Sequence, residues 1–245
     1  MKGKLLIFLL LWGGVDVSAQ TILQQFVSVG SAGDVIDMDL PVPSKKGSVL
    51  IAMPGVITPG MKVVSITDNA PAGGNTYKQV PGAASSYGGR SLDIWYCENC
   101  NPDVTELKFH VSAFARGSIN TFLEVSGLAL SSVIDGTGVN LSDGTGTNDG
   151  LKVGPSITTT APDFIIARFL STGTNPGGVT PASWKYKTTH VFIEKALPGT
   201  YQPTLTGGSP GGNFCMSMAA FKAGAPVAIS QPVSQPGLGA RHFPY

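Results

Sequence analysis

The sequence predicts an all-β protein: an antiparallel two-sheet β-sandwich, jelly-roll-like and formed as a single domain. Apolar and polar residues alternate along 91–96, 107–113 and 214–221, which is the period of a strand with one inward face. Between such segments the chain gathers many of its 32 glycines and 18 prolines, the residues that favour turns. About a dozen short strands separated in this way are typical of a sandwich or a barrel and not of a βαβ fold.

The remaining strands can be placed in chain order by the same pattern. They are expected at 22–29, 35–40, 48–53, 62–67, 77–80, 119–125, 156–160, 163–170, 190–195 and 200–205. The segment 182–197 contains neither glycine nor proline, so a helix is the alternative there, although Trp184, Tyr186 and Val191 fit strands as well. Residues 135–154 are rich in Gly, Asp, Thr and Asn, which predicts a long connection between two halves of the sandwich.

Residues 1–19 have the ordered features of a cleavable signal peptide. Lys2 and Lys4 give a positive start, residues 5–12 are apolar, and Val17-Ser18-Ala19 supplies small residues for cleavage. The apolar run is shorter than the ~20 residues that a membrane-spanning helix needs. We therefore expect an exported protein, secreted or held in the cell envelope, with a β-sandwich domain at 20–223 and a Pro-rich extended tail at 224–245.

The charge of the chain excludes two classes of partner. The formal net charge is +1 at pH 7, and only 13% of the residues are charged, against about 25% in an average soluble protein. Cleavage after Ala19 removes Lys2, Lys4 and Asp16, which carry one net positive charge, so the cleaved chain is neutral. A neutral chain fits neither a nucleic-acid binder nor a polybasic membrane patch, because both need an excess of Lys and Arg on one face.

Several phrases of the sequence, read in order, resemble an uncharacterised family of secreted bacterial β-sandwich domains. The phrases are Val64-Ser65-Ile66-Thr67-Asp68-Asn69 with Gly74-Asn75-Thr76-Tyr77, Ile94-Trp95-Tyr96, Glu124-Val125-Ser126-Gly127-Leu128, Ile134-Asp135-Gly136, Thr158-Thr159-Thr160 with Asp163, and Ala219-Ala220-Phe221-Lys222. The resemblance covers residues 49–223 and implies a jelly-roll-like sandwich at an envelope or extracellular location. It carries no assigned activity. The insertion Pro71-Ala72-Gly73 and the cysteines at 97 and 100 depart from the family's pattern.

The cysteines favour a disulfide in an oxidising compartment. Cys97 and Cys100 form a C-x-x-C motif, but a strand precedes it and no helix follows to lower the pKa of a thiol, as a redox motif requires. Zinc needs four ligands, and only Cys215 and three scattered histidines remain. We expect a Cys97–Cys100 bridge across a turn with Cys215 buried and free; a bridge from Cys215 to one of the pair is the alternative.

Three aromatic residues form the candidate ligand site. Trp184 and Tyr186 are two residues apart, so on a strand they project from one face, and Tyr87 lies in a Ser-Tyr-Gly-Gly turn. Exposed aromatic rings stack against sugar rings, which predicts glycan binding. The alternative is that Trp184 packs into the core.

Acidic residues give two further candidates. Asp143 and Asp149 flank a run of Gly, Thr and Asn, an oxygen-rich loop that could hold calcium, although it lacks the terminal Glu of an EF-hand. Glu124 lies in a mostly apolar strand and is either one of a catalytic pair of carboxylates or a structural acceptor of backbone hydrogen bonds near a loop. No G-x-S-x-G motif is present for a serine nucleophile.

Taken together, these patterns predict a secreted, non-enzymatic binding or surface-structural module whose partner is a glycan or another protein chain. Two alternatives stay open: a secreted enzyme of the glycoside hydrolase type, and a structural subunit that assembles into an extracellular layer or filament by strand addition.

Overall fold

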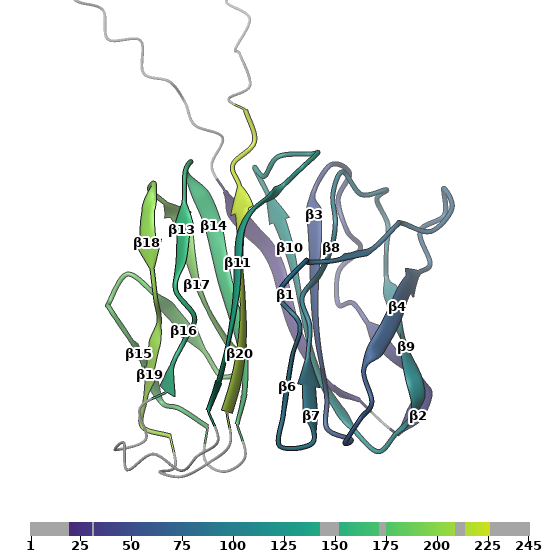
Figure 1. Cartoon of the computed structure of the whole chain (residues 1–245). Coiled ribbons are helices and arrows are strands. Elements are labelled where there is room, and N and C mark those ends of the chain that lie inside the picture. Colours follow the sequence, from purple (N-terminus) through teal and green to yellow (C-terminus); the bar gives the residue numbers. More distant parts are fainter. Residues whose placement is uncertain (1–19, 31, 143–151, 172–174, 209–213, 226–245) are drawn as a thin grey trace, which may run out of the picture.

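The computed structural model describes residues 20–30, 32–142, 152–171, 175–208 and 214–225 (Figure 1). Every regular element in this part of the chain is a β-strand, and every strand pair is antiparallel. The all-β class and the antiparallel pairing expected from the sequence are therefore confirmed. Across the same residues there is no helix long and apolar enough to cross a membrane.

The N-terminal half forms two sheets. The larger sheet has seven strands in the order β1-β10-β3-β7-β6, with β8 paired to β3 and β5 paired to β8. The smaller sheet has the order β2-β9-β4. The strands are β1 (Thr21–Gly30), β2 (Gly33–Asp39), β3 (Val49–Val56), β4 (Val63–Asp68), β5 (Lys78–Gln79), β6 (Ser85–Tyr87), β7 (Arg90–Leu92), β8 (Trp95–Cys97), β9 (Glu106–Ala115) and β10 (Ser118–Ser126).

The C-terminal half has one large sheet and two small ones. The large sheet has five strands in the order β11-β20-β14-β17-β16, and the small ones are β12-β19-β15 and β13-β18. The strands are β11 (Ile134–Ser142), β12 (Lys152–Val153), β13 (Ile157–Thr159), β14 (Asp163–Ser171), β15 (Gly178–Thr180), β16 (Lys185–Lys187), β17 (His190–Ala196), β18 (Gly199–Tyr201), β19 (Thr204–Thr206) and β20 (Phe214–Lys222).

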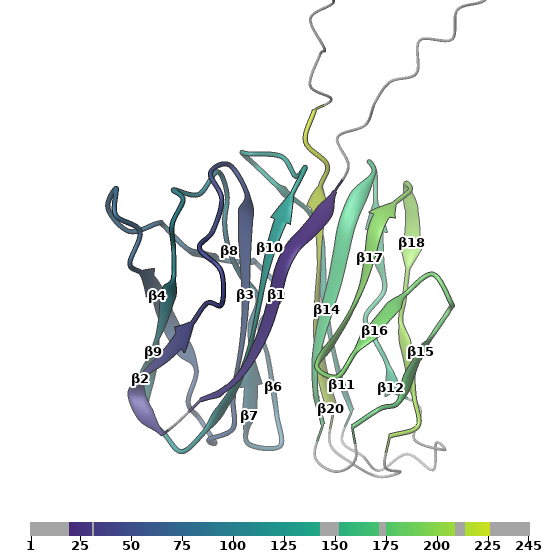
Figure 2. The same ribbon diagram turned by 180° about the vertical axis from the view of Figure 1, so that it is seen from behind.

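The sheets are stacked in four layers (Figures 1 and 2), with three large apolar clusters between them. The first cluster, around Phe109 and Phe122, lies between the three-stranded and the seven-stranded sheet. The second, around Leu123 and Phe164, joins the seven-stranded to the five-stranded sheet. The third, around Phe169, lies between the five-stranded sheet and the short outer strands. The two halves therefore share a core through the middle of the molecule.

The expectation of two sheets is wrong, because three strands are buried on both faces. Every residue of β3 and β14 is buried, as is every residue of β20 except the last. Such strands carry nearly continuous apolar residues, as in Val49-Leu50-Ile51-Ala52-Met53, whereas a half-buried strand alternates apolar and polar residues. The extra layers follow from these runs, each of which needs an apolar partner on both sides.

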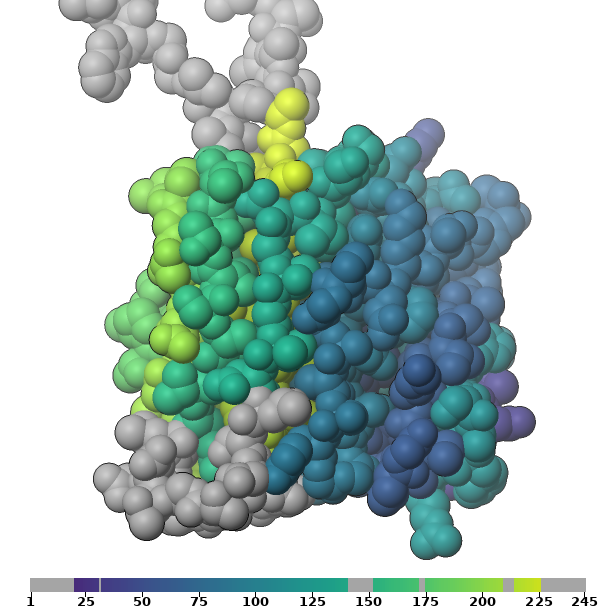
Figure 3. All heavy atoms as spheres, viewed as in Figure 1, coloured from purple at the N-terminus to yellow at the C-terminus, as the bar shows by residue number. Residues whose placement is uncertain are grey.

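The two halves repeat one strand order. In each half the first strand pairs with the last, and the last pairs with a central strand: β1-β10-β3 in one and β11-β20-β14 in the other. Each outer sheet also has a middle strand drawn from late in its half, in β2-β9-β4 and in β12-β19-β15. The space-filling view shows the halves, blue to teal and green to yellow, in contact along a continuous boundary (Figure 3).

Polar bonds cross this boundary near the start of β10. Arg168 is buried and donates hydrogen bonds to the carbonyls of Ile119 in β10 and of Thr189. The hydroxyls of Thr121 and Thr189 lie 3.1 Å apart, and burial lowers the pKa of Arg168 to about 9. Because the guanidinium bonds carbonyls of both halves, it fixes one sheet against the other at this point.

Two segments expected to be irregular or helical are strands. Residues 135–142, predicted to be a connection, belong to β11, which pairs with β20. Its glycines were misleading: a Cβ at Gly138 would lie 2.9 Å from Pro155 Cβ, so glycine serves close packing there and not a turn. The segment 182–197 holds β16 and β17, so the helix alternative is wrong. Residues 1–19 and 226–245, the predicted signal peptide and most of the predicted tail, lie outside the described residues.

Candidate functional site

A pocket of about 530 Å³ opens at one end of the molecule, where β3 ends and β10 begins. We call this end of the molecule the pocket end. Two segments line the pocket: residues 59–62, which lead from β3 to β4, and residues 84–91 with Asp93, which contain the β6–β7 hairpin. Sites for small ligands usually measure ~300–1,000 Å³, so the pocket has a suitable size.

The pocket forms where the seven-stranded sheet extends past the β2-β9-β4 sheet that packs against it. The β2-β9-β4 sheet ends at β4, whereas the seven-stranded sheet continues beyond β3 into β7 and β6. The β6–β7 hairpin turns through Gly88 and Gly89, whose φ angles of 58° and 77° suit glycine. A Cβ on Gly89 would lie 2.9 Å from Pro59 Cγ, so the missing side chain lets the hairpin tip close against the β3–β4 segment.

Asp93 is the acid that lines this pocket among the described residues. It is 4% exposed, and its Oδ1 accepts a hydrogen bond of 3.0 Å from Gln79 Nε2. Burial raises the pKa of Asp93 to about 6, opposed by the Gln79 hydrogen bond and by the Lys62 ammonium. The carboxyl group therefore changes charge close to pH 6, inside a pocket that also presents a lysine.

Ser91 adds a hydroxyl group with no bonding partner. Its Oγ is buried and makes no hydrogen bond within the described part of the chain, although the residue lines the pocket. A buried hydroxyl without a partner costs about 1–3 kcal/mol. Ser91 is therefore a polar residue of the pocket wall whose hydroxyl is used by no other group of the described chain.

Tyr87, one of the predicted ligand residues, does lie at the pocket. It lines the pocket at the hairpin, but it is half-buried and also packs against the small cluster of Leu92, Leu170 and Cys215. The neighbouring Arg90 lines the pocket too, and its Nη1 donates a 2.6 Å hydrogen bond to the carbonyl of Ser171. Tyr87 therefore forms part of the wall, and its ring is partly used in packing.

Trp184 and Tyr186 do not form the exposed aromatic pair that the sequence predicted. Trp184 precedes β16, is 4% exposed and belongs to the third apolar cluster. Tyr186 stacks against Phe169 with ring centroids 6.3 Å apart, and its hydroxyl donates to the carbonyl of Pro176. The expectation of a shared sugar-binding face is wrong, because the short outer strands cover this side of β16 and β17 with a further layer.

The predicted calcium loop cannot be placed. Asp143 and Asp149 lie outside the described residues. Within the described ranges, no group of three or more His, Cys, Asp or Glu side chains is arranged to hold a metal ion.

The cysteines are arranged as expected. Cys97 and Cys100 form a disulfide, with Cα atoms 5.9 Å apart, and Cys215 is buried and free. The bridged turn is tied to the loop before β3, because the amide of Cys100 donates to the carbonyl of Ser48. The alternative bridge to Cys215 is wrong.

Glu124 fits the structural alternative. It is 1% exposed, and its carboxylate accepts hydrogen bonds from the Lys45 amide at 2.6 Å and from Gln24 Nε2 at 2.8 Å. It thus anchors the β2–β3 loop to the inner sheet. His190 is likewise buried, and burial together with the Arg168 charge lowers its pKa to about 3, so it stays neutral.

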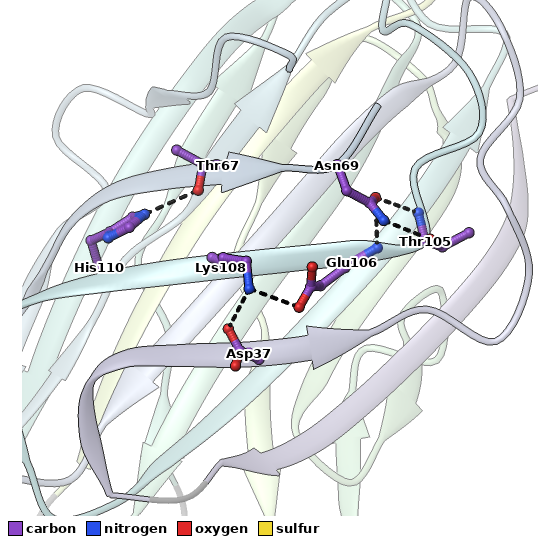
Figure 4. A network of polar contacts seen from close by, with 7 residues as sticks. All are labelled: Asp37, Thr67, Asn69, Thr105, Glu106, Lys108 and His110. Carbon is purple, nitrogen blue, oxygen red and sulfur yellow. Dashed lines mark hydrogen bonds and ion pairs between the residues drawn. The ribbon is translucent and has the colours of Figure 1, made fainter. Parts of the chain in front are cut away.

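The outer face of the β2-β9-β4 sheet carries a polar network (Figure 4). Lys108 lies between Asp37, at 3.3 Å, and Glu106, at 2.9 Å, and the His110 ring is 3.0 Å from the Thr67 hydroxyl. Ion pairs this exposed contribute little to stability, because water and salt screen them. The network lies on an open sheet surface and not in a pocket, so it is the weaker candidate for a binding site.

The fold and the pocket together define a layered, antiparallel all-β protein with one acid and one unpartnered serine hydroxyl in a surface pocket. Comparison of the chain with protein-family models, with curated proteins and with solved structures gives no significant match.

Sequence reasoning found one lining residue of this pocket and missed the others. Tyr87 was predicted as a ligand residue, whereas Ser91 and Lys62 carried no signal. The Gly88-Gly89 turn was the useful clue, since it marks the hairpin that forms one wall.

Proposed function

We propose that the protein is an exported, non-enzymatic binding module that holds a hydroxylated sugar in the pocket around Asp93. The observation that carries the proposal is the pairing of a buried carboxyl group with the unpartnered Ser91 hydroxyl in one pocket of suitable size. A carboxylate accepts hydrogen bonds from sugar hydroxyls, and a serine hydroxyl both donates and accepts them. Export rests on the features of residues 1–19.

The strand order supports the finer description of the fold. We propose that each half is a jelly-roll-like unit, since a first strand next to the last, and a second strand next to the last but one, is the arrangement that two nested Greek keys give. The likeness of several sequence phrases to a family of secreted bacterial β-sandwich domains belongs to the same proposal. A sandwich of this kind hosts many functions, so the pocket and not the fold carries the binding hypothesis.

The test is a glycan array probed with residues 20–245, followed by calorimetric titration of the sugars that bind. Asp93→Asn removes the carboxylate, so we expect the affinity to fall at least about tenfold, because a hydrogen bond to a charged group contributes about 1.5–3 kcal/mol. Asp39→Asn is the matched control, because Asp39 is an exposed aspartate at the far end of β2.

Two results would contradict the proposal. Equal binding by the wild type and the Asp93→Asn protein would place the sugar elsewhere. A blank array would remove sugar binding and make the assembly of the chain into an extracellular structure the leading hypothesis.

A further inference from the structure

Among the described residues, the pocket end carries more positive than negative charge. Lys62 and Arg90 line the pocket, and Arg116 lies beside it, because its amide donates a 2.7 Å hydrogen bond to Thr58 Oγ1, next to the lining residue Pro59. The ion pairs found in the described residues involve Lys78, Lys108 and Lys185 and none of these three cations.

Among the described residues, the acids of this end are fewer. Asp93 is buried inside the pocket, and Asp34 lies at the start of β2, where Gly33 pairs with Ala115, the residue before Arg116. The cleaved chain is neutral overall, so three cations around one opening are a local concentration and not a property of the whole surface. Charge arranged in this way attracts and orients a ligand of the opposite sign.

Lys62 and Arg116 are free to serve this purpose, whereas Arg90 is partly engaged. Both side chains belong to exposed residues, while the Arg90 guanidinium holds the carbonyl of Ser171. A ligand that spans the opening meets hydroxyl-binding groups in the pocket and ammonium and guanidinium groups at its rim. This combination matches a sugar chain that carries acid groups.

From this arrangement we infer that the ligand is an acidic polysaccharide, with one sugar ring seated against Asp93 and Ser91 and its carboxylate or sulfate groups paired with Lys62 and Arg116. The inference rests on the proposed sugar-binding function and names the class of sugar. It is specific about charge: the neutral form of the same sugar chain should bind less well, because it loses both rim contacts.

The probes are pairs of glycans that differ in charge alone: an oligogalacturonate and its methyl ester, and a sulfated glycan and its desulfated form. Binding of residues 20–245 is measured by titration at low and high salt. We expect the acidic member of at least one pair to bind about tenfold more tightly at low salt. The difference should shrink at high salt, because exposed charges are screened.

The matched variants are two double substitutions that remove the same charge. Lys62→Gln/Arg116→Gln should weaken binding of the acidic glycan about two- to fivefold for each charge removed, the range of exposed ion pairs. Lys46→Gln/Lys195→Gln is the control, since these exposed lysines lie at the opposite ends of β3 and β17 from the pocket end. The control should leave binding unchanged.

The outcomes separate the inference from the function on which it rests. Binding of neutral glycans that Asp93→Asn weakens, with no gain for the acidic members, would overturn the inference and keep the proposed function. Binding of inorganic polyphosphate or DNA as tightly as any glycan, unaffected by Asp93→Asn, would overturn it in favour of a general polyanion site. No glycan binding would overturn both.

Discussion

Single carboxyl groups dominate the chemistry of this chain at the residue scale. Asp93 and Asp163 are both buried, and burial is the largest cause of the raised pKa in each. Their surroundings differ: Asp93 faces a pocket and a lysine, whereas Asp163 faces a second acid, Asp135, with Lys222 as the nearby cation. The two residues therefore respond to pH for different reasons.

Replacing Asp93 should stabilise the protein at neutral pH. The folded-state pKa of about 6 lies above the unfolded value of about 3.9, so ionisation favours unfolding and stability falls as the pH rises from 4 to 6. Asp93→Asn cannot ionise, so its free energy of unfolding should exceed that of the wild type at pH 7 by at most about 3 kcal/mol, and match it near pH 4. Urea titrations at the two pH values measure the difference; a gap of equal size at both would rule out Asp93 as its source.

Ionisation of Asp163 should also destabilise the folded protein, and it should do so over a wider range of pH. Asp135 accepts hydrogen bonds from the amide and hydroxyl of Thr160, which favour its charge, while the pKa of Asp163 rises to about 7 through burial and the Asp135 charge. The stability that the protonated Asp163 contributes is fully present below about pH 4 and is lost as the pH rises through about 7. Asp163→Asn cannot ionise, so its melting temperature should exceed that of the wild type at pH 8 and equal it at pH 4. Scanning calorimetry would contradict this if the order at pH 8 were reversed.

At the scale of elements, the turn between β8 and β9 is held by side chains and a covalent bridge. Asp68 accepts hydrogen bonds from Asn75 and from the Tyr77 hydroxyl, and Asn75 Oδ1 accepts one from the amide of Asn101 just after the bridge. Asp68 and Asn75 are thus the residues that build this corner. The loops close on each other through polar bonds as well as through the disulfide.

Removing the Cys97–Cys100 bridge should therefore have a limited effect. A bridge between residues three apart closes a short loop, for which the chain-entropy model gives roughly 2 kcal/mol. Cys97→Ser/Cys100→Ser should lower the free energy of unfolding by about that amount and leave the far-ultraviolet circular dichroism spectrum unchanged. Denaturant unfolding of the variant beside the reduced wild type checks it, and complete loss of folding would show that the corner depends on the bridge alone.

The whole molecule is divided into two halves by topology but joined by packing. The middle cluster contains residues of both halves, among them Leu123 and Phe164, and is as deeply buried as the cores within each half. Two domains with separate cores can unfold separately, whereas sheets that share a buried face lose it together. The described part of the chain should therefore behave as one cooperative unit.

We expect a single thermal transition, with equal calorimetric and van't Hoff enthalpies. Phe164→Ala opens a cavity between the central sheets and should lower the stability by about 3–5 kcal/mol while keeping the transition single. Val64→Ala, at an exposed position on β4, should change it by less than about 0.5 kcal/mol. Two resolved transitions in the wild type would show that the halves fold independently.

The sequence by itself determined the all-β class, most strand positions and the Cys97–Cys100 bridge. These depend on local facts: the period of two, the turn residues between strands, and two cysteines close together in the chain. Residues 135–142 show the limit of that reasoning, because Gly138 serves packing against Pro155 and not a turn.

Only the tertiary structure decided the number of layers, the burial of Trp184 and the pocket. Each of these features depends on which sheet packs against which. The alternation of a strand shows that one of its faces is apolar, but it does not show which element covers the other face. Trp184 is buried because a further layer covers its strands, and Asp93 reaches a pocket because one sheet extends past its neighbour. Contacts between residues far apart in the chain set both outcomes, and no local pattern encodes them.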